Sequence, residues 1–490
     1  MIVQHLPIIQ IILPLMCAPL CLLIRHPRLV WIWATLTSVL CLPISIFLLR
    51  QVLSEGTIVY ALGGWAAPWG IEYRIDTLNA FILVIVTLIG AIVMPYARRS
   101  VELEIPNNRI YLFYTMLLLC EAGLLGIAIT GDAFNLFVFL EISSLSSYVL
   151  ISLGKDRRAL TAAYRYLITG TIGATFYIIG VGLMYNLTGS LNIYDLSKLI
   201  PELSGSRTVQ AALAFLTVGL GLKVALFPMH MWLPNAYSYA PSVVTVFLAA
   251  TATKVAVYAL IRVIYSIFGT IDILEIVTVR DMLMIMALLA MFVGSLVAIY
   301  QRNLKRMLAF SSVAQIGYMV LGLSFDTVTG VAAGIIHLFN HAVMKGGLFM
   351  VLGIVAYKIG GVRLDDVAGL GRKMPLTMAA FVGGGLSLIG VPLTVGFVSK
   401  WYLIQAALEK GWWLVAMLIV FSSLLAVIYV WRVVEVIYFQ KPGKASIGIN
   451  EAPLSMLVPA WLLIGSAFYF GIDATTTLEV AFTAAAALMR

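Results

Sequence analysis

The chain has 490 residues, of which 62% are hydrophobic and only 11% are charged. A soluble domain of this length carries about twice that share of charged residues, so the composition indicates a polytopic membrane protein. The net charge of +9 does not indicate a nucleic-acid partner, because the basic residues form short clusters between apolar segments, as topology signals do.

The apolar segments predict the fold class. A bilayer core is crossed by about 20 apolar residues, and about fourteen segments of the chain meet that requirement, so we predict an all-α membrane protein. The predicted spans are 5–24, 29–49, 77–96, 110–130, 132–153, 164–187, 209–230, 243–265, 281–300, 305–323, 328–357, 375–408, 412–438 and 454–472.

Basic residues are concentrated in alternate loops between these spans. One set of loops holds Arg25, Arg28, Arg98, Arg99, Arg109, Lys155, Arg157, Arg158, Arg302, Lys305, Arg306, Lys358, Arg363, Arg372, Lys373, Lys441 and Lys444. The opposite set holds only Arg50, Arg74, Lys198, Arg207, Arg280 and Lys410. Because Lys and Arg are retained on the cytoplasmic side, we expect a protein of the cytoplasmic (inner) membrane with both termini on the outer side.

Two predicted spans are interrupted by helix-breaking residues. The seventh span and its continuation contain Pro228, Pro234 and Pro241, and the twelfth contains Gly390, Pro392 and Gly396. Broken helices at bilayer depth are tolerated only where the freed backbone groups line a cavity, and in transporters they mark the ion site. The two breaks lie five spans apart, an odd number, so spans four to eight and nine to thirteen are predicted to be inverted five-helix repeats.

These features divide the chain into four predicted parts. Residues 1–109 hold the first three spans, and β-forming residues around turn residues between Gly56 and Asp76 predict a hairpin on the outer face. Residues 110–265 form the first repeat, residues 281–438 the second, and residues 439–490 the last span with a short tail.

Charged side chains stand inside the apolar spans, where each costs at least ~3 kcal/mol and therefore usually serves an ion pathway. Glu141 lies near the middle of the fifth span, and Lys223 lies five residues before Pro228. We expect these two side chains to pair, which would couple their titrations. The alternative is a structural carboxylate that binds neighbouring hydroxyl groups such as that of Ser144.

Two further lysines lie deep in predicted spans. Lys254 lies about midway along the eighth span, where reaching an interface is difficult, so we expect it to face an internal polar route, whereas Arg262, two turns later, can snorkel. Lys400 follows Pro392 in the second broken span. It is predicted to be the terminal proton carrier, with an outward-snorkelling lysine as the alternative.

The eleventh span carries His337, His341 and Lys345, which share one helix face. Histidine titrates near neutral pH, so this stripe would let protons pass between Lys254 and Lys400 through ordered water. Two histidines four residues apart also suit a metal, but no third ligand is nearby in the sequence, so neither a metal nor another cofactor is predicted.

Two other titratable residues have two readings each. Glu121 in the fourth span is predicted to be a second carboxylate that faces a neighbouring subunit, and a satisfied core glutamate is the alternative. His230, beside the first break, is either a structural hydrogen-bonding residue or a gate at the mouth of the pathway. The chain has no nucleotide-binding loop or nucleophile elbow, so we expect a secondary transporter subunit rather than an enzyme.

Three segments carry a family resemblance: KVALFPMHMWLPNAYSYAPSVV, QRNLKRMLAFSSVAQIGYMVLG and HLFNHAVMKGGLF. They resemble the signature segments of the proton-translocating antiporter-like subunits shared by respiratory complex I and Mrp-type sodium/proton antiporters. The resemblance implies the helix number, inverted repeats and two broken helices expected above. It also implies a central hydrophilic row in which Glu141 modulates Lys223, while Lys254 and the two histidines connect onward to Lys400.

Within the family, the chain length, Glu121 and the short tail most resemble the D-type branch of Mrp antiporters. Lys400 departs from the glutamate of the M-type subunit of complex I. The resemblance implies proton movement coupled to sodium export, in a complex with other membrane subunits. The alternatives are a proton-pumping subunit of a redox complex, either complex I-like or a membrane-bound hydrogenase, and a purely structural membrane scaffold.

Overall fold

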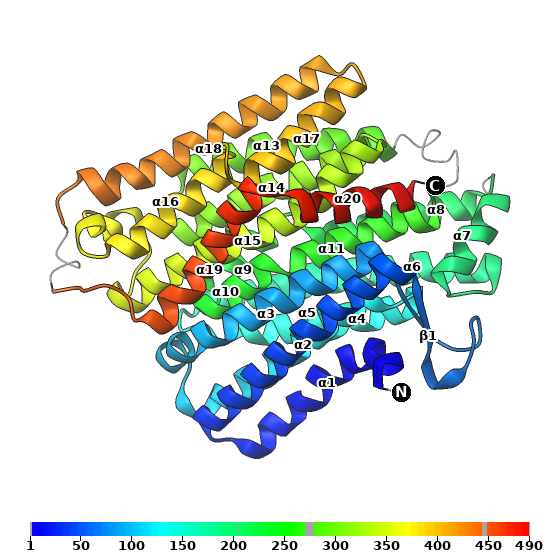
Figure 1. The fold of residues 1–490 in the computed structure, drawn as a ribbon, viewed down its shortest axis with the longest axis horizontal. Coiled ribbons are helices and arrows are strands. Elements are labelled where there is room, and N and C mark those ends of the chain that lie inside the picture. Colours follow the sequence, from blue (N-terminus) through cyan, green and yellow to red (C-terminus); the bar gives the residue numbers. More distant parts are fainter. Residues whose placement is uncertain (1, 204, 270–278, 443–447, 490) are drawn as a thin grey trace.

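The computed structural model describes residues 2–203, 205–269, 279–442 and 448–489, and its long helices lie side by side in one bundle (Figure 1). Within these residues, thirteen helical segments are long and apolar enough to cross a membrane. The helical membrane fold predicted from the sequence is confirmed. Helices dominate because lipid offers no hydrogen bonds, so each spanning segment must pair its own backbone groups.

The first part of the chain forms helices α1 (Leu6–Ile24), α2 (Pro27–Glu55), α3 (Thr77–Glu104), α4 (Ile110–Ile129), α5 (Ala133–Ser152), α6 (Arg158–Thr188), α7 (Ile193–Glu202), α8 (Arg207–Val224), α9 (Trp232–Tyr239), α10 (Ser242–Ala250) and α11 (Ala252–Ile261). A π-helical turn, η4 (Arg262–Ile267), extends α11. Helix α7 was not predicted, because its ten residues are too few to span a bilayer.

The second part forms α13 (Val279–Tyr300), α14 (Leu304–Ser324), α15 (Val328–Ile359), α16 (Pro375–Ile389), α17 (Val395–Glu409), α18 (Trp413–Phe439), α19 (Leu454–Ile472) and α20 (Thr475–Leu488). Short 3-10 turns are η1 (Ile2–His5), η2 (Leu62–Gly64), η3 (Asn107–Arg109), η5 (Leu364–Val367) and η6 (Leu370–Arg372). The tail after α19 is a short helix, as expected.

The predicted hairpin is present. Strands β1 (Ile58–Ala61) and β2 (Glu72–Ile75) pair antiparallel, with Ile58 opposite Ile75. The hydroxyl of Tyr60 in β1 lies 2.9 Å from Nδ1 of His5, so the N-terminus lies beside the hairpin. Both termini are at this end of the bundle (Figure 1), which we call the hairpin end. The α13–α14 and α15–α16 connections meet at the opposite, basic-loop end, where Asn303 bridges to Arg363.

Both predicted interruptions are observed. The α8 and α9 halves of the first broken span are separated by residues 225–231, and the α16 and α17 halves of the second by residues 390–394. The spans between them are α10–α11, α13, α14 and α15. Each crossing reverses the chain, so the two broken spans run in opposite directions, as inverted repeats require.

A third interruption was not predicted. Helix α10 ends at Ala250 and α11 begins at Ala252, and Thr251 between them has φ −121° and ψ −58°. No Pro or Gly marks this break in the sequence. The hydroxyl of Thr251 donates 2.6 Å to the carbonyl of Phe247, and such back-bonding by Thr bends helices.

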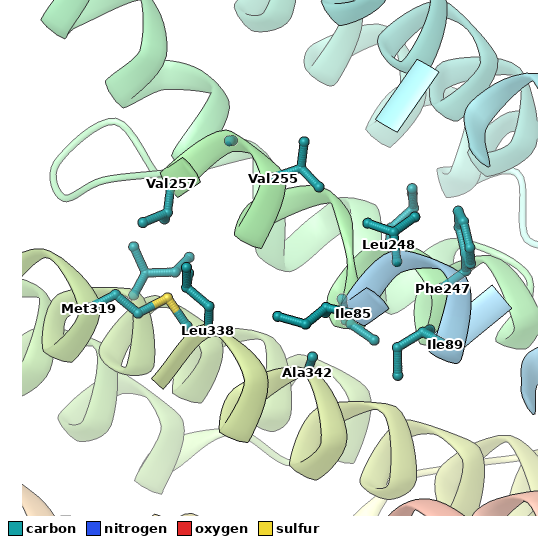
Figure 2. Packing of buried hydrophobic residues seen from close by; sticks show 14 of the residues in the cluster. Ile85, Ile89, Phe247, Leu248, Val255, Val257, Met319, Leu338 and Ala342 are labelled. Carbon is teal, nitrogen blue, oxygen red and sulfur yellow. The ribbon is translucent and has the colours of Figure 1, made fainter. Parts of the chain in front are cut away.

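The innermost helices are α14 and α15. Every described residue of α14 is buried except Arg306, and α15 is buried from Gly330 to Val355. Figure 2 shows Met319 of α14 and Leu338 of α15 opposite Val255 and Val257 of α11. Large apolar side chains are instead exposed on peripheral helices such as α6 and α18. Polar side chains on α15 are therefore held far from lipid.

A substitution at the close contact between α4 and α5 tests the helix packing. A Cβ atom at Gly123 would lie 2.6 Å from the backbone nitrogen of Ser143, so Gly123→Leu must separate the two helices. We expect a loss of about 1–3 kcal/mol in stability, measured as a lower melting temperature in detergent. Gly182→Leu is the matched control, because Gly182 of α6 has open space around it. An equal effect of both substitutions would contradict the packing argument.

Candidate functional site

The predicted pair of Glu141 and Lys223 is present. Nζ of Lys223, in the last turn of α8, lies 3.3 Å from Oε1 of Glu141 in α5. The same ammonium donates 2.7 Å to the hydroxyl of Ser144. Lys223 is buried, whereas a quarter of the Glu141 side chain is exposed. Ser144 thus binds the lysine of the pair, rather than the glutamate as the alternative reading supposed.

A small cavity lies beside this pair. It is lined by Lys223, by Ser143, Ser144, Ser147 and Tyr166, and by Ala252 and Ala256 of α11. The two alanines flank Lys254 in the sequence, so the cavity lies between the first ion pair and the helix of the next lysine. Its hydroxyl groups can hold a water molecule, which needs two to four polar partners.

Lys254 is completely buried, as predicted. Its ammonium donates to the carbonyl oxygen of Ala249 and, at 3.3 Å, to the hydroxyl of Thr253. The carbonyl of Ala249 belongs to the C-terminal end of α10, where the helix dipole is negative. The unpredicted break at Thr251 therefore supplies the partner of the central lysine, and no carboxylate among the described residues forms an ion pair with it.

The two histidines of α15 are completely buried and their rings are nearly parallel, with centroids 6.2 Å apart. Nδ1 of His337 lies 2.7 Å from the hydroxyl of Ser399, and Nε2 lies 2.9 Å from Oε1 of Gln315. Neither ring nitrogen of His341 has a hydrogen-bond partner among the described residues. Within the same residues, no group of three His, Cys, Asp or Glu side chains is arranged to hold a metal ion.

Lys345 lies one turn beyond His341 on the same helix and is completely buried. Its ammonium donates 2.8 Å to the carbonyl of Leu308 and also to the hydroxyl of Ser311, both in α14. The predicted polar face of α15 is thus enclosed by α14. Ser311, Gln315 and Ser399, which bind these side chains, were not predicted as site residues, because isolated Ser and Gln residues carry no signal in an apolar sequence.

Lys400 is buried, so the snorkelling alternative is wrong. Lys400 lies in the second turn of α17, and its ammonium extends back across the break to the C-terminal end of α16. There it donates hydrogen bonds to the carbonyl oxygens of Leu388 (3.1 Å) and Ile389 (2.8 Å). It also lies 4.9 Å from the centroid of the Tyr318 ring, within the range of a cation–π contact. Like the Lys254 ammonium, it is held by carbonyl groups at the end of an interrupted helix.

Glu121 is completely buried within the chain. Its Oε2 accepts a 2.5 Å hydrogen bond from Ser38 of α2, and its Oε1 points at Gly90 of α3 without a partner among the described residues. Helices α2 and α3 cover this face of α4. The satisfied core glutamate is the closer reading, although only one oxygen is bonded.

His230 lies beside the first break, as expected, and is buried. Its ring stacks on Phe227, with centroids 5.2 Å apart, and meets the edge of Phe310. Nδ1 has no partner among the described residues. The packing around the His230 ring is therefore largely aromatic.

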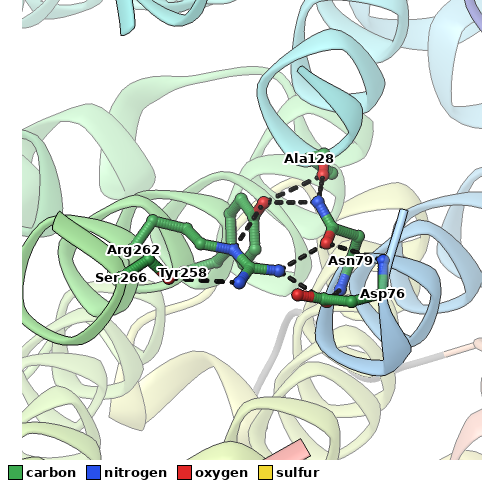
Figure 3. A network of polar contacts seen from close by, with 6 residues as sticks. All are labelled: Asp76, Asn79, Ala128, Tyr258, Arg262 and Ser266. Carbon is green, nitrogen blue, oxygen red and sulfur yellow. Dashed lines mark hydrogen bonds and ion pairs between the residues drawn. The ribbon is translucent and has the colours of Figure 1, made fainter. Parts of the chain in front are cut away.

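Arg262 is buried and does not reach the membrane interface, which the sequence suggested it could do from its place two turns after Lys254. Figure 3 shows its guanidinium between Tyr258 and the start of α3. Nη2 of Arg262 lies 2.5 Å from Oδ1 of Asp76 and also donates to Oδ1 of Asn79. Nε donates 3.1 Å to the hydroxyl of Tyr258. Burial alone would raise the pKa of Asp76, but the charge of Arg262 outweighs burial and lowers it. The pair therefore stays ionised at neutral pH.

The site consists of separate hydrogen-bonded groups rather than one continuous chain. Glu141 with Lys223, Lys254 with α10, His337 with its two partners, and Lys400 with α16 follow one another through the bundle. Among the described residues, no direct hydrogen bond joins one group to the next. Transfer of a proton between the groups requires water or side-chain movement.

Comparison with known proteins identifies the family that shares this arrangement. Residues 130–426 match the family described as NADH:quinone oxidoreductase/Mrp antiporter, TM. The chain belongs to this family. It is therefore an antiporter-like membrane subunit of the kind found in Mrp and complex I-like assemblies, as its three signature segments predicted.

Relatives of this antiporter-like subunit come from both kinds of assembly. NADH-quinone oxidoreductase subunit N of Desulforudis audaxviator is 44% identical over 478 residues, which cover 94% of each chain. The putative antiporter subunit mnhD2 of Staphylococcus haemolyticus is 30% identical, over 97% of this chain and 94% of that one.

Solved structures give the same picture. A chain of the Mrp complex from Dietzia sp. DQ12-45-1b matches with a TM-score of 0.91 and 25% identity, over 100% of this chain and 98% of that one. A chain of the membrane-bound sulfane sulfur reductase, an archaeal respiratory membrane complex, matches with a TM-score of 0.92 and 31% identity. The match covers 99% of this chain and 98% of that one. The fold is common to both assemblies, so fold alone does not choose between them.

The Asp76–Arg262 pair generates a stability prediction. In a double-mutant cycle of Asp76→Asn and Arg262→Gln, we expect a coupling of about 2 kcal/mol, because each single substitution leaves a partly buried charge unpaired. Thermal unfolding of the purified subunit measures it. Since the pKa of Asp76 is lowered in the folded state, the coupling is present at neutral pH and is lost as the pH falls below about 4.

The exposed pair of Asp156 and Arg158 is the control, and its coupling should be smaller. Equal couplings for the two pairs would contradict the structural role assigned to Arg262.

Proposed function

We propose that this subunit moves protons across the membrane along the row Glu141, Lys223, Lys254, His341, His337 and Lys400. The observation that carries the proposal is the 3.3 Å ion pair of Glu141 and Lys223 inside an apolar bundle. A buried lysine with one movable carboxylate partner is a proton switch. The carboxylate stabilises the ammonium, and withdrawal of the carboxylate leaves a desolvated charge that favours release of the proton.

The next steps pass through groups without carboxylates. Lys254 and Lys400 are held by carbonyl oxygens, which stabilise an ammonium less than a full negative charge does, so both lysines can exchange a proton. Between them, the unbonded nitrogens of His341 and the bonded nitrogens of His337 are acceptors and donors. Buried polar groups normally bind protein or water, so ordered water is the proposed link.

Three residues have supporting roles in this proposal. Lys345 places an ammonium on the polar face of α15 and donates to Ser311 of α14. His230, packed between Phe227 and Phe310 beside the break, is proposed as a gate whose ring must turn to admit water. Glu121, with one unbonded oxygen, is proposed as a second carboxylate that binds a proton away from the main row.

Other membrane subunits are the proposed partners. The exposed face of α5 carries Phe134, Val138, Leu145 and Val149, and the half-buried Glu141 lies in the same stripe. A carboxylate that faced lipid at this depth would cost about 3 kcal/mol, so a neighbouring subunit is proposed to cover it. We place the basic-loop end at the cytoplasmic side of the cell membrane, with the hairpin end and both termini outside.

Replacement of Lys223 tests the row. In everted vesicles that hold the assembled complex, Lys223→Ala should reduce proton movement by about tenfold or more, and Glu141→Gln should also reduce it. Lys410→Ala, at an exposed lysine, is the control and should transport normally. Undiminished transport by Lys223→Ala in a fully assembled complex would overturn the proposed function.

Sodium export in exchange for protons is the proposed coupling, in an Mrp-type complex. It is supported by the similarity to the antiporter subunit mnhD2 and to the Mrp complex. A second candidate, a proton-pumping subunit of a redox complex, is favoured by the higher identity of 44% to an oxidoreductase subunit. In either case the chain is a transporting subunit, and the redox chemistry of the second candidate belongs to its partners.

Purification of the native complex separates the two candidates. An Mrp-type complex should yield small membrane subunits, and an imposed sodium gradient should drive proton movement in its vesicles. A redox complex should yield iron–sulfur or flavin proteins, and proton movement should follow electron transfer and persist without sodium. Sodium-independent transport by a complex that contains redox proteins would refute the sodium exchange.

A further inference from the structure

Lys305 is not a loop residue. The sequence places it among the basic residues that flank a predicted span, but the structure shows it in the first turn of α14 with only 6% of its surface exposed. Its ammonium donates 3.1 Å to the hydroxyl of Ser242. A topology signal would face water and lipid headgroups, so a buried lysine at this position needs another explanation.

Ser242 joins this lysine to an acidic residue. The backbone N–H of Ser242, at the first turn of α10, donates 2.8 Å to Oε2 of Glu104, and Ser100 donates 2.9 Å to the other carboxylate oxygen. Glu104 is the last residue of α3. Ser242 thus binds Glu104 through its backbone amide and Lys305 through its hydroxyl, so it lies between the two titratable groups.

The outer side of this cluster opens to a surface cavity at the basic-loop end. Glu104 lines the cavity together with Glu102, Asn107, Arg109, Ser152 and Asp156, which lie at or near the α3–α4 and α5–α6 connections. Glu104 is half-buried, whereas Ser242 and Lys305 are buried behind it. The carboxylate of Glu104 is therefore the member of the cluster that meets water.

The inner side of the cluster leads to the proposed proton row. Leu308 and Ser311 are one and two turns beyond Lys305 on α14, and both bind the ammonium of Lys345. Each turn of helix rises ~5 Å, and water or a movement of the flexible lysine stem is the proposed link between Lys305 and Lys345. Lys345 in turn shares the polar face of α15 with His341 and His337.

The hairpin end has a contrasting arrangement. There the buried cation near the surface cavity is Arg262, which is held by Asp76 and Asn79 (Figure 3). Arginine is not deprotonated in proteins, so it presents a fixed positive charge that repels a passing proton. Lysine can release its proton. Of these two clusters, only the one at the basic-loop end is built from groups that can all gain and lose protons.

We propose that Glu104 and Lys305 form the proton-access route between the basic-loop surface and Lys345, with Ser242 as the residue that positions both. This inference rests on the proposed function. Glu104 takes a proton from water in the surface cavity and gives it to the neutral amine of Lys305, which restores the carboxylate. The ammonium of Lys305 then gives a proton to the neutral amine of Lys345 and returns to its starting state.

Substitutions of Lys305 that keep or remove its charge test the route. Lys305→Arg retains the positive charge but cannot release a proton, and Lys305→Met removes the charge. Glu104→Gln removes the outer acid. We expect all three variants to reduce the initial rate of proton movement by about tenfold or more in vesicles with normally assembled complex. Assembly is checked by co-purified subunits and melting temperature.

Exposed Lys373 at the same end provides the matched controls, and Lys373→Arg and Lys373→Met should transport at the normal rate. If Lys305→Arg transports normally while Lys305→Met does not, the lysine only supplies charge and the route is overturned. Normal transport by Glu104→Gln overturns it as well. If one of these results overturns the route but Lys223→Ala still abolishes transport, the proposed function remains intact. Normal transport by Lys223→Ala would instead overturn the proposed function itself.

Discussion

The site depends on one physical constraint: a lysine ammonium inside the bilayer must find negative charge within the protein. Among the described residues, the only lysine that forms an ion pair with a carboxylate is Lys223. Lys254 and Lys400 instead bind carbonyl oxygens at the ends of interrupted helices. Because the last carbonyls of a helix lack intrahelical partners and carry the negative end of its dipole, each break creates a site for a cation. The breaks and the lysines therefore stabilise each other.

This arrangement explains why the polar row lies where it does. Helix α15 carries both histidines and Lys345, and it is enclosed by α14, by the second broken span and by the α10–α11 break. Buried apolar side chains such as Leu338 and Met319 pack between α14, α15 and α11 (Figure 2). They exclude lipid and bulk water, which strengthens every remaining electrostatic contact. The polar groups can then influence one another through the low-dielectric interior.

The two ends of the bundle differ in the kind of charge that they bury. At the hairpin end, Arg262 binds Asp76 and fastens η4 to the start of α3. At the basic-loop end, Ser242 holds Lys305 beside Glu104. The first arrangement is a fixed ion pair, and the second consists of groups that can exchange protons. This difference between the two ends arises from side chains rather than from helix geometry.

The sequence by itself determined the helical membrane fold, the two breaks at Pro and Gly, the hairpin and the partnership of Glu141 with Lys223. These features follow from local composition and from the cost of isolated charge in lipid. Only the tertiary structure decided the break at Thr251, the burial of Lys305 and the pairing of Arg262 with Asp76. Each depends on contacts between distant segments, and hydropathy does not reveal which side of a helix those segments cover. Glu121 illustrates the reason: α2 and α3 enclose it, and nothing in the residues around it indicates that cover.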